Sequence, residues 1–267
     1  MSKWILIIGA VLILGILGFF VLNRYIYNEK QGDFMENADT STTTQQVKVT
    51  PISHASMVLE MGGSVIYNDP VGGVDAFINH PEADIILLSD IHGDHLDPET
   101  VQALATERTV IVVPQAVADQ LPATLPGTVV VLANGETTTQ NDIQIQAVPM
   151  YNMPELADAP HVKGRGNGYL LEANGERVYI AGDTGGTPEM RALQNIDIAF
   201  VPMNLPYTMS VEDAADAVLA FKPKVVHPYH YRGPDGLADV NKFKELVNAG
   251  DPNITVELLN FYPEENN

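Results

Sequence analysis

The stretch "LLSDIHGDHLD", residues 87–97, gathers carboxylates and histidines directly after an apolar run. Like charges repel, and each of these side chains would be hydrated more favourably on its own, so a bound cation is a physical reason for gathering them. Side chains alternate along an extended chain, so Asp90, His92 and Asp94 project to one side, and His95 follows where the chain turns. The stretch therefore predicts a metal site with four converging ligands. An acidic, solvated turn with two ordinary histidines is the alternative interpretation.

Further carboxylate and imidazole groups stand at the ends of other apolar runs. Asp69 ends "VIYND", Asp183 follows "YIAG" and His230 follows "VVHPY". Ligand sites in open α/β sheets assemble at the ends of strands, so these separated segments are expected to meet around one centre. Imidazole nitrogen combined with carboxylate oxygen suits zinc, and also manganese or iron where carboxylates are numerous. Taken one by one, the two aspartates could instead be turn residues, and the histidine a structural one.

The apolar runs around these residues predict two rounds of strands and helices. Each round opens with a hairpin, the first turning at Gly62-Gly63 and the second at Asn174-Gly175. Strand–helix units follow, and "ADIILLSD" has the continuous apolar character of a buried strand. Two packed sheets with helices on their outer faces satisfy this order, so the predicted fold class is α/β, a four-layer αββα sandwich. Helices are expected after Asp97-Pro98 and at residues 188–194, 211–221 and 240–248.

The beginning of the chain has a different character from the rest. Residues 4–23 carry no charge and have about the length that a helix needs to cross a bilayer. The following segment is polar and rich in threonine, as linkers are. We therefore predict a transmembrane anchor at 1–25, a flexible linker at 26–46 and a catalytic domain at 47–267. The expected localisation is single-pass membrane with an extracytoplasmic catalytic domain, and a cleaved signal peptide is the alternative.

The charge balance limits the class of substrate. The chain has 34 acidic residues against 14 Lys and Arg, a net charge of −20. Such a chain lacks the basic surface that nucleic-acid binding needs, so no nucleic-acid partner is expected. It has no cysteine, and so no disulfide framework to indicate a compartment. The oligomeric state is not indicated.

The motifs "SDIHGDHLD", "GDT" and "PYHY", in this order, resemble the H-x-H-x-D-H, GDT and final-histidine motifs of the metallo-β-lactamase fold. The branch they resemble is that of L-ascorbate-6-phosphate lactonase. The likeness runs from about Val47 to Tyr262 and includes "ISHAS", "NDP", "VPMYN", "HVKGRGNGYLL" and "VPMNLPYTMSVEDAADAV". It implies the four-layer sandwich and a metal-dependent hydrolase with one or two divalent ions, zinc or manganese, with iron as a further option.

The resemblance also implies roles for individual residues. His92 matches a ligand of the first metal, and Asp183 matches the carboxylate that bridges the two. Asp69 matches the aspartate that braces the metal loop by hydrogen bonds without being a ligand. The full set of predicted metal ligands is Asp90, His92, Asp94, His95, Asp183 and His230.

Two departures from the family pattern concern the first metal. Asp90 stands where the family usually has a histidine, and Met150, Tyr151 and Asn152 stand where many members have another. The first site has thus lost up to two imidazoles, which predicts one firm metal site and one weak or differently populated site. The additional carboxylate favours a harder cation such as manganese or iron over zinc.

Two residues are predicted to act in catalysis, Asp94 by orienting the attacking water and His161 as a general acid. A flexible-loop surface histidine is the alternative interpretation of His161. His54, Tyr151 and Asn152 are expected near the centre, in contact with ligands or substrate.

The sequence predicts a membrane-anchored metal-dependent hydrolase that uses a metal-activated water on a lactone, ester or phosphodiester. The substrate is expected to be a small molecule or a lipid, because related phospholipases of the D type share the fold. A non-catalytic metal-binding or sensing domain with a degraded first site is the alternative.

Overall fold

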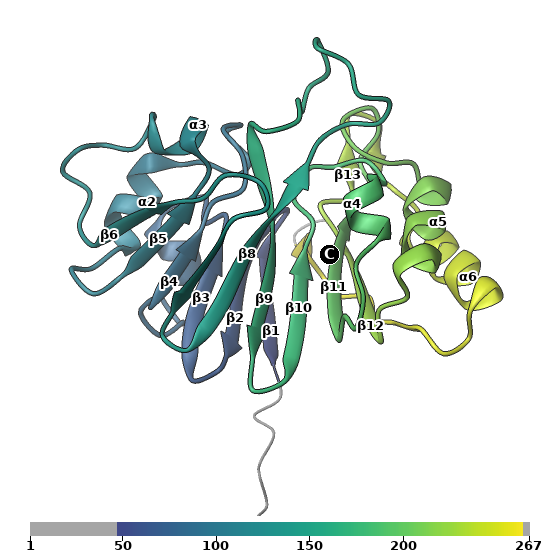
Figure 1. The fold of residues 1–267 in the computed structure, drawn as a ribbon, viewed down its shortest axis with the longest axis horizontal. Helices are drawn as coiled ribbons and strands as arrows, with labels where there is room; N and C mark the ends of the chain where they lie inside the picture. The colour runs from purple at the N-terminus through teal and green to yellow at the C-terminus, as the bar shows by residue number, and fades with distance from the viewer. Residues whose placement is uncertain (1–46, 264–267) are drawn as a thin grey trace, which may run out of the picture. The chain divides into compact units, whose positions relative to one another are not determined.

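The computed structural model describes residues 47–263, and within this range two β-sheets face each other (Figure 1). The first sheet has six strands in sequence order: β1 (Lys48–Ser53), β2 (Ser56–Met61), β3 (Ser64–Asn68), β4 (Ile85–Leu87), β5 (Val110–Val113) and β6 (Thr128–Val131). The second has seven, in the order β15 (Thr255–Val256), β12 (Val225–Tyr229), β11 (Ile198–Pro202), β10 (Glu176–Ile180), β9 (Gly166–Ala173), β8 (Ile143–Met150) and β7 (Thr137–Gln140). A small pair, β13 (Arg232–Gly233) and β14 (Gly236–Leu237), follows β12.

Helices cover the outer faces of both sheets. In Figure 1, α2 and α3 lie beside the first sheet, and α4, α5 and α6 lie beside the second. The layers therefore run helix, sheet, sheet, helix, and the predicted mixed α/β fold is confirmed. The helices are η1 (Val74–Phe77, a 3₁₀ turn), α2 (Pro98–Leu104), α3 (Gln115–Ala118), α4 (Pro188–Arg191), α5 (Val211–Phe221) and α6 (Val240–Gly250).

The local signals in the sequence account for these boundaries. The predicted hairpins form, β2 with β3 and β9 with β10, each antiparallel. Asp97 caps α2 by accepting hydrogen bonds from the backbone of Glu99 and Thr100, and Pro98 takes the first helical position. Ser210 caps α5 in the same way through the backbone N–H of Asp213. Capping satisfies backbone donors that have no partner within the helix, so each helix begins at its cap.

Strand β4 shows why the centre of the first sheet is apolar throughout. Ile85 and Leu87 pack into the core between the sheets, whereas Ile86 and the following Leu88 pack into a second core under α2. Alternate side chains of the strand thus enter two different cores, and a strand covered on both faces has no position for a charge. The first polar side chains after the strand occur only where it leaves the sheet.

The parallel strands place several chain segments at one edge. β3, β4, β5 and β6 run parallel in the first sheet, as do β10, β11, β12 and β15 in the second. Asp69 follows β3, Asp90 lies three residues beyond β4, Asp183 follows β10 and His230 follows β12. The carboxyl ends of parallel strands share an edge, so the candidate ligands come together there.

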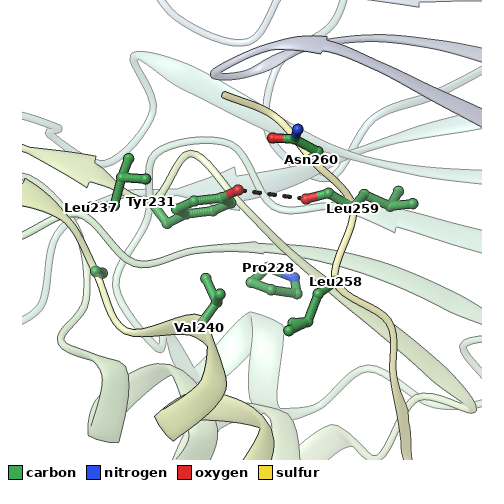
Figure 2. Close-up of a pocket in the computed structure, with 8 residues that line it drawn as sticks. Pro228, Tyr231, Leu237, Val240, Leu258, Leu259 and Asn260 are labelled. Carbon is green, nitrogen blue, oxygen red and sulfur yellow. Dashed lines mark hydrogen bonds between the residues drawn. The ribbon is translucent and has the colours of Figure 1, made fainter. Parts of the chain in front are cut away.

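An apolar pocket of about 300 Å³ lies near α6 (Figure 2). It is lined by Pro228, Tyr231, Leu237, Ala238, Val240, Leu258, Leu259 and Asn260. None of the predicted metal ligands lines it.

The predicted membrane localisation is corrected by the structure. Of the helices between residues 47 and 263, α5 and α6 have 11 residues each, about 16 Å at 1.5 Å per residue, and a bilayer's hydrocarbon core is about 30 Å thick. No helix in this range is long and apolar enough to cross a membrane. The expected anchor at 1–25 and linker at 26–46 lie outside the described residues.

Candidate metal centre

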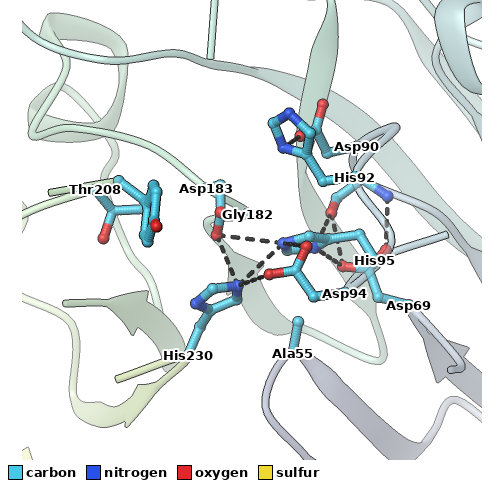
Figure 3. Close-up of polar contacts among 12 residues, drawn as sticks. Ala55, Asp69, Asp90, His92, Asp94, His95, Gly182, Asp183, Thr208 and His230 are labelled. Carbon is cyan, nitrogen blue, oxygen red and sulfur yellow. Dashed lines mark hydrogen bonds and ion pairs between the residues drawn. The ribbon is translucent and has the colours of Figure 1, made fainter. Parts of the chain in front are cut away.

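Four side chains form a compact group, the second cluster, at the edge shared by the strand ends (Figure 3). Its members, Asp94, His95, Asp183 and His230, each offer one ligand atom, and these atoms lie within 4.8 Å of one another. His230 Nε2 is 3.3 Å from both Asp94 Oδ2 and Asp183 Oδ1. His95 Nε2 is 3.4 Å from the same Asp183 oxygen. Donors bound to one tetrahedral zinc ion lie about 3.3 Å apart, so this group has the spacing of a metal site.

Asp69 fixes the orientation of His95. Its carboxylate accepts hydrogen bonds from Ser89, at 2.7 Å from the backbone N–H and 2.6 Å from the hydroxyl, and its Oδ2 is 2.9 Å from His95 Nδ1. A histidine that donates from Nδ1 to a carboxylate presents the lone pair of Nε2 to a metal. Both Asp69 and His95 are fully buried, so their arrangement is locked by packing. The structure thus places Asp69 behind the ligand and away from the cluster itself.

The charges of the second cluster call for a cation. Burial opposes the protonation of His95, but Asp183 and Asp69 outweigh it and raise the pKa of His95 well above its ordinary value. Burial likewise disfavours ionised Asp183, yet His230 and His95 hold the pKa of that carboxyl well below its usual range. The Nε2 atoms of His95 and His230 are 3.1 Å apart. Two lone pairs at that distance repel unless a proton or a metal ion lies between them.

Asp183 connects the second cluster to another one. Its Oδ1 faces His95 and His230, whereas its Oδ2 is 3.2 Å from His161 Nε2. The backbone reaches this position through Gly182, whose φ is +67° and where a Cβ would lie 2.3 Å from the sulfur of Met150. A side chain at residue 182 would be strained at this φ and would have to displace Met150, so glycine is favoured at the position before Asp183.

The first cluster contains Asp90, His92 and His161. His92 Nδ1 is 2.6 Å from Asp90 Oδ2, and His161 Nε2 is 3.6 Å from the same oxygen. The hydrogen bond that His92 donates to the Asp90 carboxylate is the main reason that the pKa of His92 is raised. The departures in the sequence are therefore compensated in part, because His161 supplies an imidazole that the residues after β8 do not.

The structure places His161 in the interior, beside Asp90 and Asp183. The residue is 2% exposed, so the alternative interpretation of a surface histidine is wrong. Its Nδ1 is 3.2 Å from both the side-chain oxygen of Asn152 and the carbonyl oxygen of Tyr207, and either can accept its proton. With Nδ1 protonated, Nε2 carries a lone pair directed at Asp90 and Asp183. That arrangement suits a metal ligand better than a general acid.

Arg165 is a member of the site that the sequence analysis missed. Its Nε is 3.2 Å from Asp90 Oδ1 and its Nη2 is 3.3 Å from Asp90 Oδ2. Asp90 itself is fully buried, so the guanidinium neutralises a carboxylate that solvent does not reach. The residue was quoted within "HVKGRGNGYLL", but nothing in its local pattern indicates a partner 75 positions earlier in the chain.

The remaining predicted site residues have different positions. His54 Nε2 is 3.2 Å from Asp94 Oδ2, and its ring lies 3.7 Å from that of His230, so it borders the second cluster. Tyr151 is buried and its hydroxyl donates to Glu189 at 2.8 Å, away from both clusters. The hydroxyl of Tyr151 is thus paired with a carboxylate, and its expected contact with ligands or substrate stays a prediction. Asn152 acts on the centre through His161.

The donor atoms fit a divalent cation in both clusters. His161 Nε2 and Asp183 Oδ1 are buried and make no hydrogen bond to the described residues. Buried polar atoms are rarely left without a partner, and these two point to where cations would be held. Nitrogen and oxygen donors of this kind suit zinc, manganese and iron alike, so the donor set does not select one metal.

A cavity of about 370 Å³ opens onto both clusters. It is lined by seven residues: His92, Asp94, Pro160, His161, Asp183, Asn204 and Tyr207. The Asp94 side chain is 44% exposed, whereas that of Asp183 is only 4% exposed. Asp94 is thus the member of the second cluster that a molecule in the cavity reaches, and His92, with a side chain 40% exposed, is also within its reach. Asn204 and Tyr207 were not predicted as site residues.

Comparisons with known proteins agree with this geometry. The family model described as a beta-lactamase superfamily domain matches residues 48–230, a range that contains every residue of both clusters. A UPF0173 metal-dependent hydrolase of Thermococcus onnurineus is 33% identical over 210 residues, 75% of this chain and 92% of the relative. One of Carboxydothermus hydrogenoformans is 32% identical over 227 residues, 80% of this chain and 97% of the relative. A Parabacteroides distasonis structure, assigned to the metal-dependent hydrolases, is 40% identical with a TM-score of 0.70, covering 79% and 92% of the two chains.

Proposed function

The chain belongs to the beta-lactamase superfamily and is a metal-dependent hydrolase, and from this premise we propose that it hydrolyses a small lactone, ester or phosphodiester at the paired clusters. The observation that carries the proposal is that four possible metal-ligand atoms of the second cluster lie within 4.8 Å of one another. A divalent cation bound there supplies a Lewis acid and lowers the pKa of a water molecule.

The side chains of this protein prepare that chemistry. Asp69 holds His95 in the tautomer that faces the cluster, and Asp183 presents one oxygen to each cluster. Asp94 is the one second-cluster ligand that is substantially exposed to the cavity. His54 and His230 contact its Oδ2, so Oδ1 is the atom left to orient an attacking water.

The cavity supports a small substrate. Its volume of about 370 Å³ is near the lower end of the range of about 300–1,000 Å³ that small-molecule sites occupy. Asn204 and Tyr207 line the same cavity as the carboxylates and offer polar groups that can contact the polar atoms of a substrate. The lactone option follows from the resemblance of the sequence motifs to the lactonase branch.

The test uses the full-length protein with its bound metals. Metal content is measured by plasma mass spectrometry, and the same sample is tested on a panel of lactones, carboxylic esters and phosphodiesters before and after chelation. We expect bound divalent metal and turnover of at least one class, with activity lost on chelation and restored by metal. His95→Ala should lose both metal and activity.

A matched control is His227→Gln. His227 is buried, stacks on Phe200 and has its Nδ1 3.1 Å from the carbonyl oxygen of Glu257, outside both clusters. This variant also loses a buried histidine, so it should keep the metal content of the wild type. Absence of metal from the wild-type protein would overturn the proposal.

The non-catalytic alternative has one observation in its favour, the arginine that occupies both oxygens of Asp90. In a cluster whose carboxylate is already paired with a guanidinium, a metal ion that activates water has one ligand fewer to bind. Metal bound in the second cluster without turnover of any compound in the panel would support a binding or sensing role.

A further inference from the structure

The strongest feature not explained by the proposed function is the environment of Asp90. The carboxylate is fully buried, and Arg165 contacts it through two nitrogens, Nε at 3.2 Å and Nη2 at 3.3 Å. Two parallel contacts from one guanidinium fix both the position and the rotation of a carboxylate. Arg165 also donates from Nη2 to the carbonyl oxygen of Pro160, which holds the guanidinium in place. Asp90 is therefore a fixed group.

The chain is built so that the arginine reaches Asp90. The backbone N–H of Asn167 donates to the carbonyl oxygen of Ser89 at 2.9 Å, which joins the start of β9 to the residue before Asp90. Gly166 stands between Arg165 and Asn167 in the chain, and a Cβ at this residue would lie 2.8 Å from the Ser89 oxygen. Glycine at residue 166 allows this close approach, which brings the preceding residue, Arg165, beside Asp90.

Asp90 keeps one direction open despite the arginine. Its Oδ2 is 2.6 Å from His92 Nδ1 and 3.6 Å from His161 Nε2. A cation bound by Oδ2 would take the place of the hydrogen that His92 Nδ1 donates to this oxygen, and the same oxygen can still accept from Arg165. The three atoms then form a donor set of two nitrogens and one oxygen, joined by Asp183 Oδ2.

The charges of the pair explain the substitution of aspartate for histidine at this position. A lone buried aspartate would add one negative charge to the cluster, whereas aspartate with arginine adds none, as a neutral imidazole adds none. We propose that the Asp90–Arg165 ion pair replaces a neutral imidazole in the first cluster, so that cation binding there depends on the two side chains as a pair. This inference rests on the proposed function, because it takes the second cluster to be a metal site. It replaces the expectation that Asp90 alone makes the first site prefer a harder cation.

A double-mutant cycle tests the proposal. The four proteins are the wild type, Asp90→His, Arg165→Met and the double variant Asp90→His/Arg165→Met. Each is stripped of metal and titrated with Zn²⁺ and with Mn²⁺ by calorimetry, with metal content after dialysis as a second readout. The binding step that disappears in His161→Ala identifies the first cluster.

The pair predicts a distinctive pattern. Asp90→His leaves the guanidinium unpaired beside the cluster, so Zn²⁺ affinity of the first step should fall about ten- to hundredfold, the usual effect of changing a residue that supports a ligand. Arg165→Met leaves an uncompensated carboxylate, so the metal preference of the first cluster should shift from Zn²⁺ towards Mn²⁺. The double variant is neutral again and should recover Zn²⁺ binding to within about threefold of the wild type.

Two further variants separate the pair from general effects of arginine. Arg165→Lys keeps the positive charge but cannot contact both oxygens of Asp90 as the planar guanidinium does, and should give an intermediate loss of Zn²⁺ affinity. Arg108→Met removes an arginine from an exposed ion pair with Glu82, where N···O is 3.1 Å, and should change neither step. Thermal melting of every variant checks that the fold is kept.

Three outcomes would overturn the inference. If Asp90→His binds Zn²⁺ equally well with and without Arg165, the two residues do not act as a pair. If the first step is absent from all four proteins while the second cluster binds one ion, the first cluster is not a metal site and the proposed function still stands. If the wild type binds no ion at all, both the inference and the proposed function fail.

Discussion

The two clusters of the metal centre use the same kinds of side chain but are supported in different ways. The second cluster takes its ligands from the ends of β10 and β12 and from the start of the turn before α2, and it has no arginine or lysine partner among the described residues. The first cluster takes His161 from the connection between β8 and β9 and carries Arg165 against Asp90. The second cluster thus has imidazoles and a cation from outside as its sources of positive charge, whereas the first cluster also has the guanidinium of Arg165.

The largest expected effect comes from the residue that the two clusters share. Asp183→Asn removes the carboxylate charge but keeps the size of the side chain, so both clusters should lose most of their metal. Activity should fall about 10³-fold or more, because metal ions supply several kcal/mol of transition-state stabilisation. Metal content and hydrolysis are measured on the same sample. Retention of one full equivalent of metal would show that Asp183 serves a single cluster.

A comparison of His95→Ala with His161→Ala then separates the clusters. His95 is fully buried and faces the second cluster, so its loss should remove that ion and nearly all activity. Loss of His161 should remove the first ion and leave the second, with about one equivalent of metal bound. Metal analysis and single-step titrations measure both. Equal losses in the two variants would mean that the clusters bind metal only together.

Asp69→Asn should have a smaller effect. The amide can still accept from Ser89, but it no longer attracts the proton on His95 Nδ1 as a carboxylate does. The metal affinity of the second cluster should fall about ten- to hundredfold, while the metal affinity of the first cluster should remain unchanged. Calorimetric titration with Zn²⁺ distinguishes the two steps. A change in the first step alone would contradict the assigned position of Asp69.

The smallest effect concerns the pH dependence of stability without metal. The folded-state pKa of His95 is raised, because its carboxylate neighbours outweigh burial. The folded state therefore binds more protons than the unfolded state above about pH 6.5, and this stability is lost as the pH rises through the folded pKa. The melting temperature of the metal-free protein should decrease over that window, by about 3 °C per kcal/mol lost. His95→Gln should flatten the slope, and an unchanged slope would assign it to other groups.

Much of the fold could be predicted because its signals are local. Gly62-Gly63 and Asn174-Gly175 mark the hairpins, and Asp97 and Ser210 mark helix starts through their own hydrogen bonds. The apolar segment "ITVELL" at residues 254–259 has the composition of a longer strand, yet only Thr255–Val256 pairs in the sheet. A short apolar segment forms a strand only as far as a neighbouring strand offers partners, and that depends on tertiary structure.

The candidate site could be predicted in part. The second-cluster residues stand in local motifs, and the structure brings all four together. His161 was expected at the centre as a general acid, but its grouping with Asp90 and His92 and the pairing of Arg165 with Asp90 were not foreseen, because both depend on where the connection between β8 and β9 lies in the fold. Asn204 and Tyr207 carry no motif that ties them to a metal centre, yet they line its cavity.

The sequence by itself determined the kinds of ligand available, the mixed α/β order of the elements and the strand ends at which ligands would stand. These follow from short-range rules, since capping, turns and apolar runs act over a few residues. Only the tertiary structure decided which donors share an ion and which charges are already balanced. Asp90 and Arg165 lie 75 positions apart in the chain but about 3 Å apart in space. Electrostatic energy depends on that separation in space and on burial, and the fold alone sets both.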